Sequence, residues 1–202
     1  MRTRSETTRE AILQAALQLL SEREFANIGT GEIARAAGVA EGTIFRYFPS
    51  KADIYVAILQ EKGNQVEPKI LAELDAIEDP LGKLLYLAEQ HLKFALQHRD
   101  ILWVIHREST FARGKADQPC FDRLRKLVDL FERILSEGAR ERIFLPGLDA
   151  RACALQFVGT LHSILLEDRL FRGGNSSERW LRQRARAYHA TLLRGILSQE
   201  ET

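Results

Sequence analysis

Apolar residues recur every three or four positions along almost the whole chain, which is the spacing of one face of an α-helix. Near the start, one such stripe runs through Ile12, Ala16, Leu19 and Leu20, and the segment Thr7 to Glu10 carries a reciprocal capping signal for this first helix. The alternation of apolar and polar residues that marks a half-buried strand is not sustained anywhere in the sequence. The pattern therefore predicts an all-α fold.

The predicted helices become short between about residue 25 and residue 51. Thr30 is a candidate cap for the first of them, and Gly38 can adopt the positive φ that ends it. A tight turn then leads into a second short helix, from about Glu41 to Phe48. Two short helices joined by a glycine-containing turn predict a helix-turn-helix.

The second short helix carries three aromatic residues within four positions. They cannot all face one core, because neighbours on a helix lie about 100° apart. Ile44 and Phe48 are predicted to point inward, whereas Phe45, Arg46 and Tyr47 are predicted to face nucleic acid. There, a ring can pack on a thymine methyl, a guanidinium can pair with guanine and a phenol can reach phosphate. The alternative interpretation is that the aromatic residues simply form a packed helical corner.

Beyond Gly63 the predicted helices lengthen. A helix from about Ser50 to Lys62 is expected to end before Pro68, which suits the first turn of a separate helix. Another helix is expected to follow Asp100, and the last two helices are expected to begin near Asp149 and Ser177.

The run TGEIARAAGVAEGTIFRYFPSK, from Thr30 to Lys51, closely resembles the DNA-binding motif of the tetracycline-repressor (TetR-like) family, whose pattern is roughly IAxxAGVSxGTLYxYFxSK. The rest of the chain resembles the family only in the layout of its helices. The resemblance implies an N-terminal three-helix helix-turn-helix DNA-binding domain over residues 1–62, with its motif at about 28–47. A larger helical effector-binding and dimerisation domain would then occupy residues 63–202.

The same resemblance implies a ligand-responsive transcriptional regulator, not an enzyme. Such a protein would bind a pseudopalindromic double-stranded DNA operator as a homodimer, usually as a repressor released by a small hydrophobic or amphipathic effector. Drugs, lipidic signals and acyl-coenzyme A thioesters are among the effectors of the family. By motif position, the DNA contacts would fall on Thr30, Ala40, Glu41, Gly42, Thr43, Phe45, Arg46, Tyr47 and Lys51.

Three positions depart from the family pattern. Ala40 replaces the usual serine and loses a helix cap, and Phe45 replaces a tyrosine and cannot donate to phosphate. Glu41 stands where lysine is frequent. Its carboxylate should repel phosphate unless it accepts from a cytosine amino group or pairs with Arg46.

An effector pocket is expected between the longer helices, because ligand cavities are mostly apolar with a few placed polar groups. Ordinary core packing is the alternative for each of its candidate residues, which are Phe94, Trp103, His106, Phe131, Gln156 and Phe157.

The last two helices are the candidates for dimerisation, since the first of them is too apolar for a solvated helix and Gly159 permits close approach. Paired with their symmetry mates, they would form the four-helix bundle that the resemblance implies. The predicted interface residues are Leu155, Val158, Gly159, His162, Leu181, Ala185, Tyr188 and Leu192.

No catalytic residue, metal site or cofactor is predicted. The five histidines include no His-x-x-x-His pair, and the two cysteines do not fall at a finger-like spacing. A helical enzyme acting on a lipid-like substrate is disfavoured, because no Ser-His-Asp or paired-carboxylate arrangement is evident. A DNA-binding regulator without an effector remains an open alternative.

Composition and charge add little to this picture. The formal net charge is +1, and residues 1–51 hold seven Lys and Arg against six Glu, which is a weak footprint for nucleic acid. The apolar runs are shorter than the roughly 18 residues of a transmembrane helix, and no signal peptide is indicated. A soluble cytoplasmic protein without a membrane partner is expected.

Overall fold

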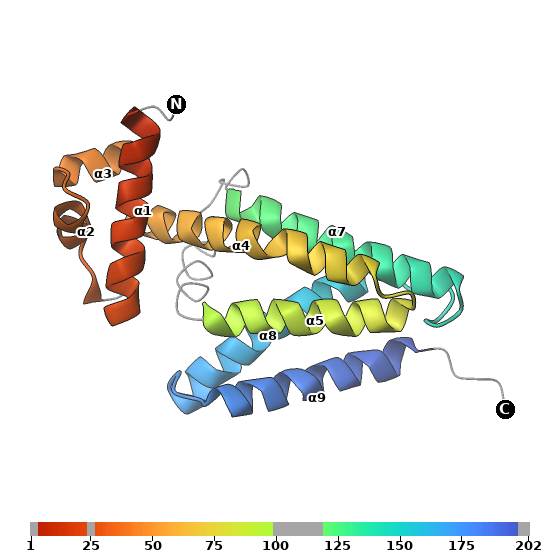
Figure 1. The fold of residues 1–202 in the computed structure, drawn as a ribbon. Helices are drawn as coiled ribbons and strands as arrows, with labels where there is room; N and C mark the ends of the chain where they lie inside the picture. Colours follow the sequence, from red (N-terminus) through yellow and green to blue (C-terminus); the bar gives the residue numbers. More distant parts are fainter. Residues whose placement is uncertain (1–3, 24–26, 99–118, 198–202) are drawn as a thin grey trace. The chain divides into compact units, whose positions relative to one another are not determined.

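The computed structural model describes residues 4–23, 27–98 and 119–197 (Figure 1). Within these ranges the regular elements are α-helices, joined by one isolated antiparallel bridge between Phe144 and Leu197. The predicted all-α fold is therefore confirmed. The helix expected after Asp100 lies outside the described residues. The helices are α1 (Arg4–Glu22), α2 (Thr30–Ala36), α3 (Glu41–Tyr47), α4 (Lys51–Asp75), α5 (Pro80–Gln97), α7 (Pro119–Arg140), α8 (Ala150–Arg172) and α9 (Glu178–Ile196).

The described residues fall into two compact units that divide between Gln65 and Val66. The first unit contains α1, α2, α3 and the first part of α4, and α2 packs against both α1 and α3. Its core consists of buried apolar side chains from all four helices, including Ile12, Ala16, Ile33, Ile44 and Tyr55.

The second unit contains the rest of α4 together with α5, α8, α9 and most of α7. Helices α8 and α9 run side by side in opposite directions, joined by a turn in which Gly173 has a φ of 68°, and α5 packs on both (Figure 1). The largest buried side chains of this unit are Phe131, Phe144 and Phe157.

Helix α4 is one continuous element, so the predicted break between Lys62 and Pro68 is wrong. Pro68 lies inside the helix, where its missing N–H removes one intrahelical hydrogen bond. The helix continues because its inward face does: Leu59, Gly63 and Leu74 are buried, and Ile70 packs against the core of the second unit.

Hydrogen bonds confirm the helix starts predicted at Asp149 and Ser177, and a cap of the same kind begins α5. The carboxylates of Asp79 and Asp149 accept from the N–H of Gly82 (2.7 Å) and Ala152 (2.8 Å), and Ser177 caps α9. The capping signal at Thr7 to Glu10 is wrong, because α1 already includes Arg4. Thr8 instead donates to the Arg4 carbonyl, as a hydroxyl in a helix interior does.

No helix in the described part of the chain is both long enough and apolar enough to span a membrane.

Candidate DNA interface and ligand-binding core

The helix-turn-helix of the first unit is formed by α2, the turn at residues 37–40, and α3. Gly38 has a φ of 67°, the left-handed conformation expected for the residue that ends α2. Ile44 and Phe48 are buried against this unit, which confirms their predicted inward orientation. These two side chains fix the rotation of α3 about its own axis, and with it the face that α3 leaves exposed.

The exposed face of α3 carries the side chains expected to contact DNA. Phe45 is 49% exposed, which is unusual for a phenylalanine in a small helical unit, and Arg46 is also exposed. Gly42 is exposed with nothing near the place where a Cβ would lie, and Thr43 is half-buried. Ala40 is the N-cap of α3 and provides no side-chain cap, as its replacement of serine predicts. The exposed face of α3 is therefore free of internal packing.

Tyr47 is half-buried and linked to its neighbours. Its hydroxyl accepts from Arg46 Nη2 at 3.2 Å and from Ser5 Oγ at 3.4 Å, and the Arg46 guanidinium lies 5.2 Å from the Tyr47 ring centre. The hydrogen bond from Ser5, followed by that from Arg46, lowers the pKa of the Tyr47 phenol. Tyr47 therefore holds Arg46 against α3 and attaches the start of α1 to the motif.

Thr30 does not cap α2 as predicted, because Gly29 occupies the N-cap position. The capping interaction is instead made by Glu32, whose carboxylate accepts from the Gly29 N–H at 2.9 Å and from Arg23 at 3.0 Å. Thr30 Oγ1 is left to donate to Glu41 Oε1 at 2.6 Å. The acidic residue at the start of α3 is therefore bonded to α2, not to Arg46.

Lys51 lies at the start of α4, where its ammonium donates to the Ile28 carbonyl at 2.6 Å. Partial burial lowers the pKa of Lys51, and the Glu32 carboxylate offsets part of this effect. Lys51, an expected DNA contact, is thus also a link between α4 and the segment before α2.

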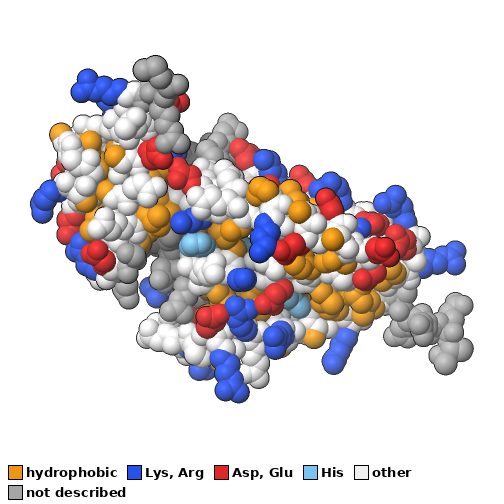
Figure 2. All heavy atoms as spheres, viewed as in Figure 1, with side chains coloured by type: hydrophobic (Ala, Val, Ile, Leu, Met, Phe, Trp, Pro, Cys, Tyr) orange, Lys and Arg blue, Asp and Glu red, His pale blue; other side chains and the backbone are white. Residues whose placement is uncertain are grey.

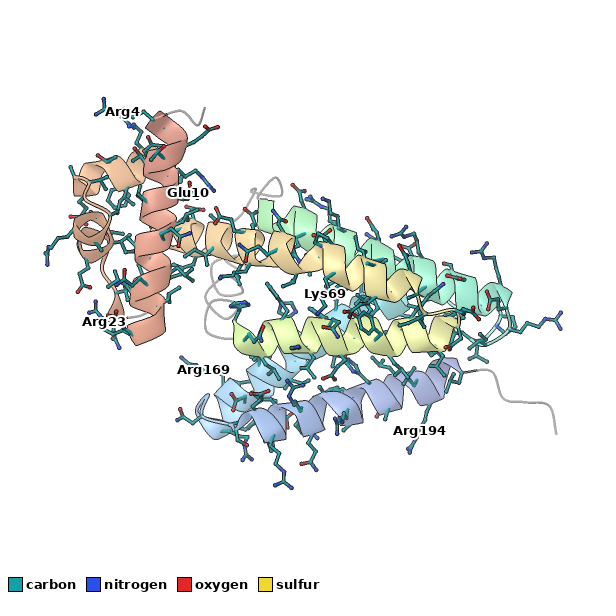
Figure 3. The ribbon with its side chains drawn as sticks, viewed as in Figure 1. Arg4, Glu10, Arg23, Lys69, Arg169 and Arg194 are labelled. Atoms are coloured by element: carbon teal, nitrogen blue, oxygen red, sulfur yellow. The ribbon has the colours of Figure 1, made fainter. Side chains whose placement is uncertain are left out.

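Charges of both signs surround the helices of each unit. In the first unit, Arg4 and Arg23 lie at opposite ends of α1, with Glu10 between them (Figure 3). Over the viewed face of the second unit, acidic and basic side chains are interspersed (Figure 2). Arginines of α9 pair locally, Arg184 with Glu167 at 2.9 Å and Arg182 with Glu89 at 2.7 Å. Arg182 and Arg184 are therefore part of an ion-paired surface of α9.

The residues predicted for the effector pocket are only partly brought together. Phe131 and Phe157 are buried and stacked, with ring centres 5.6 Å apart and planes 12° apart. Phe94 is half-buried, and its ring centre lies 4.7 Å from that of His98. The Arg123 guanidinium lies 5.6 Å from the Phe94 ring centre. Trp103 and His106 lie outside the described residues.

Gln156 lies apart from this group. Its side chain is exposed and lines a groove between α8 and α9, because adjacent residues on a helix point about 100° apart and Phe157 takes the inward direction. Gln156 therefore does not belong with Phe131 and Phe157.

Two histidines that sequence reasoning did not assign to the pocket flank the stacked phenylalanines. His91 of α5 contacts Phe131 edge-on at 6.5 Å, and His189 of α9 lies 5.5 Å from Phe157. Burial, and to a lesser degree the nearby His162 and His189, lower the pKa of His91 to about 4. Burial also lowers the pKa of His189. The centre of the second unit thus combines aromatic carbon with neutral imidazole.

Acid is expected to destabilise the protein through His91. Because its folded pKa of about 4 lies below the ordinary value of 6.5, the unfolded chain binds a proton first as the pH falls. The free energy of unfolding contributed by this group is therefore lost between about pH 6.5 and pH 4, and amounts to about 2 kcal/mol between pH 7 and pH 5. Urea denaturation of the wild-type and His91→Gln proteins at both pH values measures it. An equal loss in the two proteins would contradict this role for His91.

A groove of about 480 Å³ lies between α8 and α9 of the second unit. Most of the side chains that line it are small or polar, and Leu155, Leu166 and Leu170 are exposed along α8 beside it. The α8–α9 groove is lined by Gln156, Gly159, Thr160, Ser163, Arg184, Ala187, Tyr188, Thr191 and Leu192.

The residues predicted for the dimer interface do not all lie on one surface of the protomer. Gly159, Tyr188 and Leu192 line the α8–α9 groove, Leu155 is exposed next to it, and His162 is half-buried. The remaining three are already buried within one protomer and offer no surface to a partner; these are Val158, Leu181 and Ala185. Leu166 and Leu170, which the sequence analysis does not single out, are exposed on the same face of α8 as Leu155.

Among the described residues, no group of three or more His, Cys, Asp or Glu side chains is arranged to hold a metal ion.

Comparison with protein families gives two matches to different parts of the chain. Residues 12–58 match the model of bacterial regulatory proteins, tetR family. Residues 78–166 match the model of the tetracyclin repressor-like C-terminal domain. The first match spans the helix-turn-helix, and the second covers α5, α7 and most of α8.

Individual proteins are similar over most of the chain. The fatty acid metabolism regulator protein of Bacillus subtilis is 25% identical over 74% of this chain and 77% of its own length. The nucleoid occlusion factor SlmA of Vibrio atlanticus is 28% identical over 81% of this chain and 84% of its own. The structure of FadR from Thermus thermophilus, a repressor in complex with lauroyl-CoA, superposes with a TM-score of 0.73 at 22% identity, covering 95% and 96% of the two chains.

Proposed function

Because the chain belongs to the TetR family of bacterial regulatory proteins, we propose that it is a homodimeric repressor whose hold on its operator is released by an acyl-coenzyme A thioester. Like its relatives, it is a DNA-binding transcriptional regulator and not an enzyme. The observation that carries the proposal is the helix-turn-helix itself, in which Ile44 and Phe48 are buried while Phe45 and Arg46 are exposed on one face of α3.

The proposed DNA contacts follow from this arrangement. The start of a recognition helix contacts base edges in the major groove, and the helix before it crosses the backbone. Phe45 then packs against a thymine methyl or a sugar, and Arg46 donates hydrogen bonds to a guanine or a phosphate. Two such helices in a symmetric dimer enter successive major grooves about 34 to 36 Å apart, or somewhat farther, which makes the operator pseudopalindromic.

The proposed effector is a long-chain acyl group attached to coenzyme A. Support comes from the names of the relatives, one a fatty acid metabolism regulator and another a repressor holding lauroyl-CoA. The second unit offers suitable chemistry: Phe131 and Phe157 supply apolar surface for an acyl chain, and His91 and His189 supply neutral polar groups beside it. Arg123, which lies next to Phe94 and pairs with Glu67 at 3.2 Å, is a cation that the phosphates of coenzyme A could engage by exchanging that pair.

Release of DNA requires that the effector prefer a conformation that binds the operator less well. Helix α4 contributes residues to both compact units and is therefore the proposed connection. A coupling free energy of about 1 to 3 kcal/mol is typical of such systems and corresponds to a roughly 5- to 150-fold loss of DNA affinity.

A thermal-shift series tests the effector assignment. Lauroyl-CoA, coenzyme A and lauric acid are added separately to the full-length protein, and the melting temperature is followed. Binding to the folded state raises the melting temperature, so lauroyl-CoA is expected to raise it most and coenzyme A least. Equal shifts for all three compounds, or no shift with any, would contradict an acyl-CoA effector.

The second candidate function is a DNA-binding protein that has no small-molecule effector. It is favoured by the similarity to SlmA, which is named as a nucleoid occlusion factor. The same series separates the two functions, since this candidate requires that none of the three compounds alter the melting temperature.

A further inference from the structure

The bond between Thr30 and Glu41 places a carboxylate on the side of the motif that meets DNA. Thr30 is the first residue of α2 and Glu41 the first residue of α3. Thr30 Oγ1 donates to Glu41 Oε1 at 2.6 Å. A Cβ built on Gly31 would lie only 3.3 Å from Glu41 Oε2 and 3.5 Å from Oε1, so the carboxylate rests against the first turn of α2. Both Glu41 and its contact with α2 lie at the surface.

This carboxylate has no neutralising cation among the described residues. Two cations of this unit are engaged elsewhere, since Arg46 donates to the Tyr47 hydroxyl and Arg23 donates to Glu32. Glu41 therefore presents a negative charge where phosphates approach. It also occupies the Thr30 hydroxyl, and threonine hydroxyls are common donors to phosphate oxygens.

A purely mechanical role is the simplest alternative, in which the bond only ties α2 to α3. A glutamine would serve that role as well as a glutamate, because its side-chain oxygen accepts the same hydrogen bond. The charge itself would then have no effect on DNA binding beyond that of any other surface acid.

We propose that Glu41 is a specificity-determining residue that disfavours generic DNA and reads a cytosine. On most DNA sequences the Glu41 carboxylate repels the phosphates and, by accepting from the Thr30 hydroxyl, prevents that hydroxyl from donating to the DNA backbone. Where a half-site presents a cytosine amino group to the start of α3, the carboxylate turns to accept from that group. Thr30 is then free to donate to phosphate. This inference rests on the proposed DNA-binding function.

The test uses the full-length protein and two DNA probes. One is a short duplex of random sequence, and the other is the operator that the wild-type protein selects from a random library. The variants are Glu41→Ala, Glu41→Gln, Thr30→Val and the double variant Thr30→Val with Glu41→Ala. Glu22→Gln is the charge control, since Glu22 is exposed at the end of α1 and makes no side-chain hydrogen bond or ion pair within the described residues.

On random DNA, Glu41→Ala is expected to bind about fivefold more tightly than wild type, from lost repulsion and the freed hydroxyl. Glu41→Gln is expected to show a smaller gain, because it loses the charge and keeps the bond. In the Thr30→Val background the gain from Glu41→Ala is expected to fall by about half, since no hydroxyl is left to free. At one position of each half-site of the selected operator, wild type is expected to prefer cytosine over other bases. In Glu41→Ala this preference, measured as a ratio of affinities, is expected to be about tenfold smaller.

Three outcomes would overturn the inference. These are a gain on random DNA no larger than that of Glu22→Gln, a gain unchanged in the Thr30→Val background, and selection of the same bases by Glu41→Ala as by wild type. Circular-dichroism melting confirms that each variant is folded, and Glu41→Gln preserves the link between α2 and α3. If wild-type protein binds no duplex at all, the proposed function fails; if wild type binds and the variants match it, only this inference fails.

Discussion

Leu155→Glu is expected to convert the protein from a dimer into a monomer of 23.0 kDa. Leu155 is 53% exposed on α8, beside the α8–α9 groove. In an isologous dimer the same patch faces its own copy, so each substitution acts twice. An unpaired charge buried in such an interface is strongly destabilising, and the dissociation constant is expected to rise by at least about a hundredfold.

Leu85→Glu is the matched control for this experiment. Leu85 is 45% exposed, nearly as much as Leu155, but it lies on α5 and outside the α8–α9 groove. Multi-angle light scattering at micromolar concentration is expected to show a dimer for wild type and Leu85→Glu and a monomer for Leu155→Glu. A dimer in all three proteins would place the interface elsewhere, and a monomeric wild type would remove the proposed symmetry of the operator.

Arg46→Ala is expected to cost about 1 to 3 kcal/mol of binding free energy at the selected operator, which is roughly tenfold or more in affinity. Arg46 is exposed on α3, and its described contacts are confined to the hydroxyl and ring of Tyr47. The folded state therefore loses little when the guanidinium is removed. Lys51→Ala is a less clean test, because it also removes the bond to the Ile28 carbonyl and is expected to lower stability.

Arg186→Ala removes the same charge from an exposed position on α9 and serves as the control. Electrophoretic mobility shifts at two salt concentrations separate a specific contact from general electrostatics. Operator affinity is expected to fall for Arg46→Ala and to stay at the wild-type value for Arg186→Ala. Equal affinities for the two variants would show that Arg46 does not contact the operator.

Sequence periodicity was sufficient to predict the orientation of α3. Ile44 and Phe48 lie four positions apart and are buried, as one face of a helix requires, and Phe45 is left exposed. The predicted break before Pro68 is wrong because the apolar face of α4 continues past the proline and reaches Leu74. A proline alone therefore does not show that a helix ends.

The candidate sites depended more on tertiary contacts, which a local pattern does not contain. Gln156 and Phe157 are predicted to share a pocket because a ligand cavity combines apolar with a few polar groups, yet adjacent residues on a helix lie on different faces. Leu181 and Ala185 belong to the apolar stripe of α9, and the stripe does not reveal whether α8 or a partner covers it. The Thr30–Glu41 bond joins residues eleven positions apart, across a turn whose geometry only the structure supplies.

The most direct test of the account is the effect of lauroyl-CoA on the complex between the wild-type protein and its selected operator. Fluorescence anisotropy of the labelled operator reports the bound fraction, and unmodified coenzyme A is the control. Lauroyl-CoA is expected to return the anisotropy to that of free DNA, whereas coenzyme A is expected to leave it unchanged. A complex that persists while lauroyl-CoA is bound to the protein would contradict an acyl-CoA-released repressor.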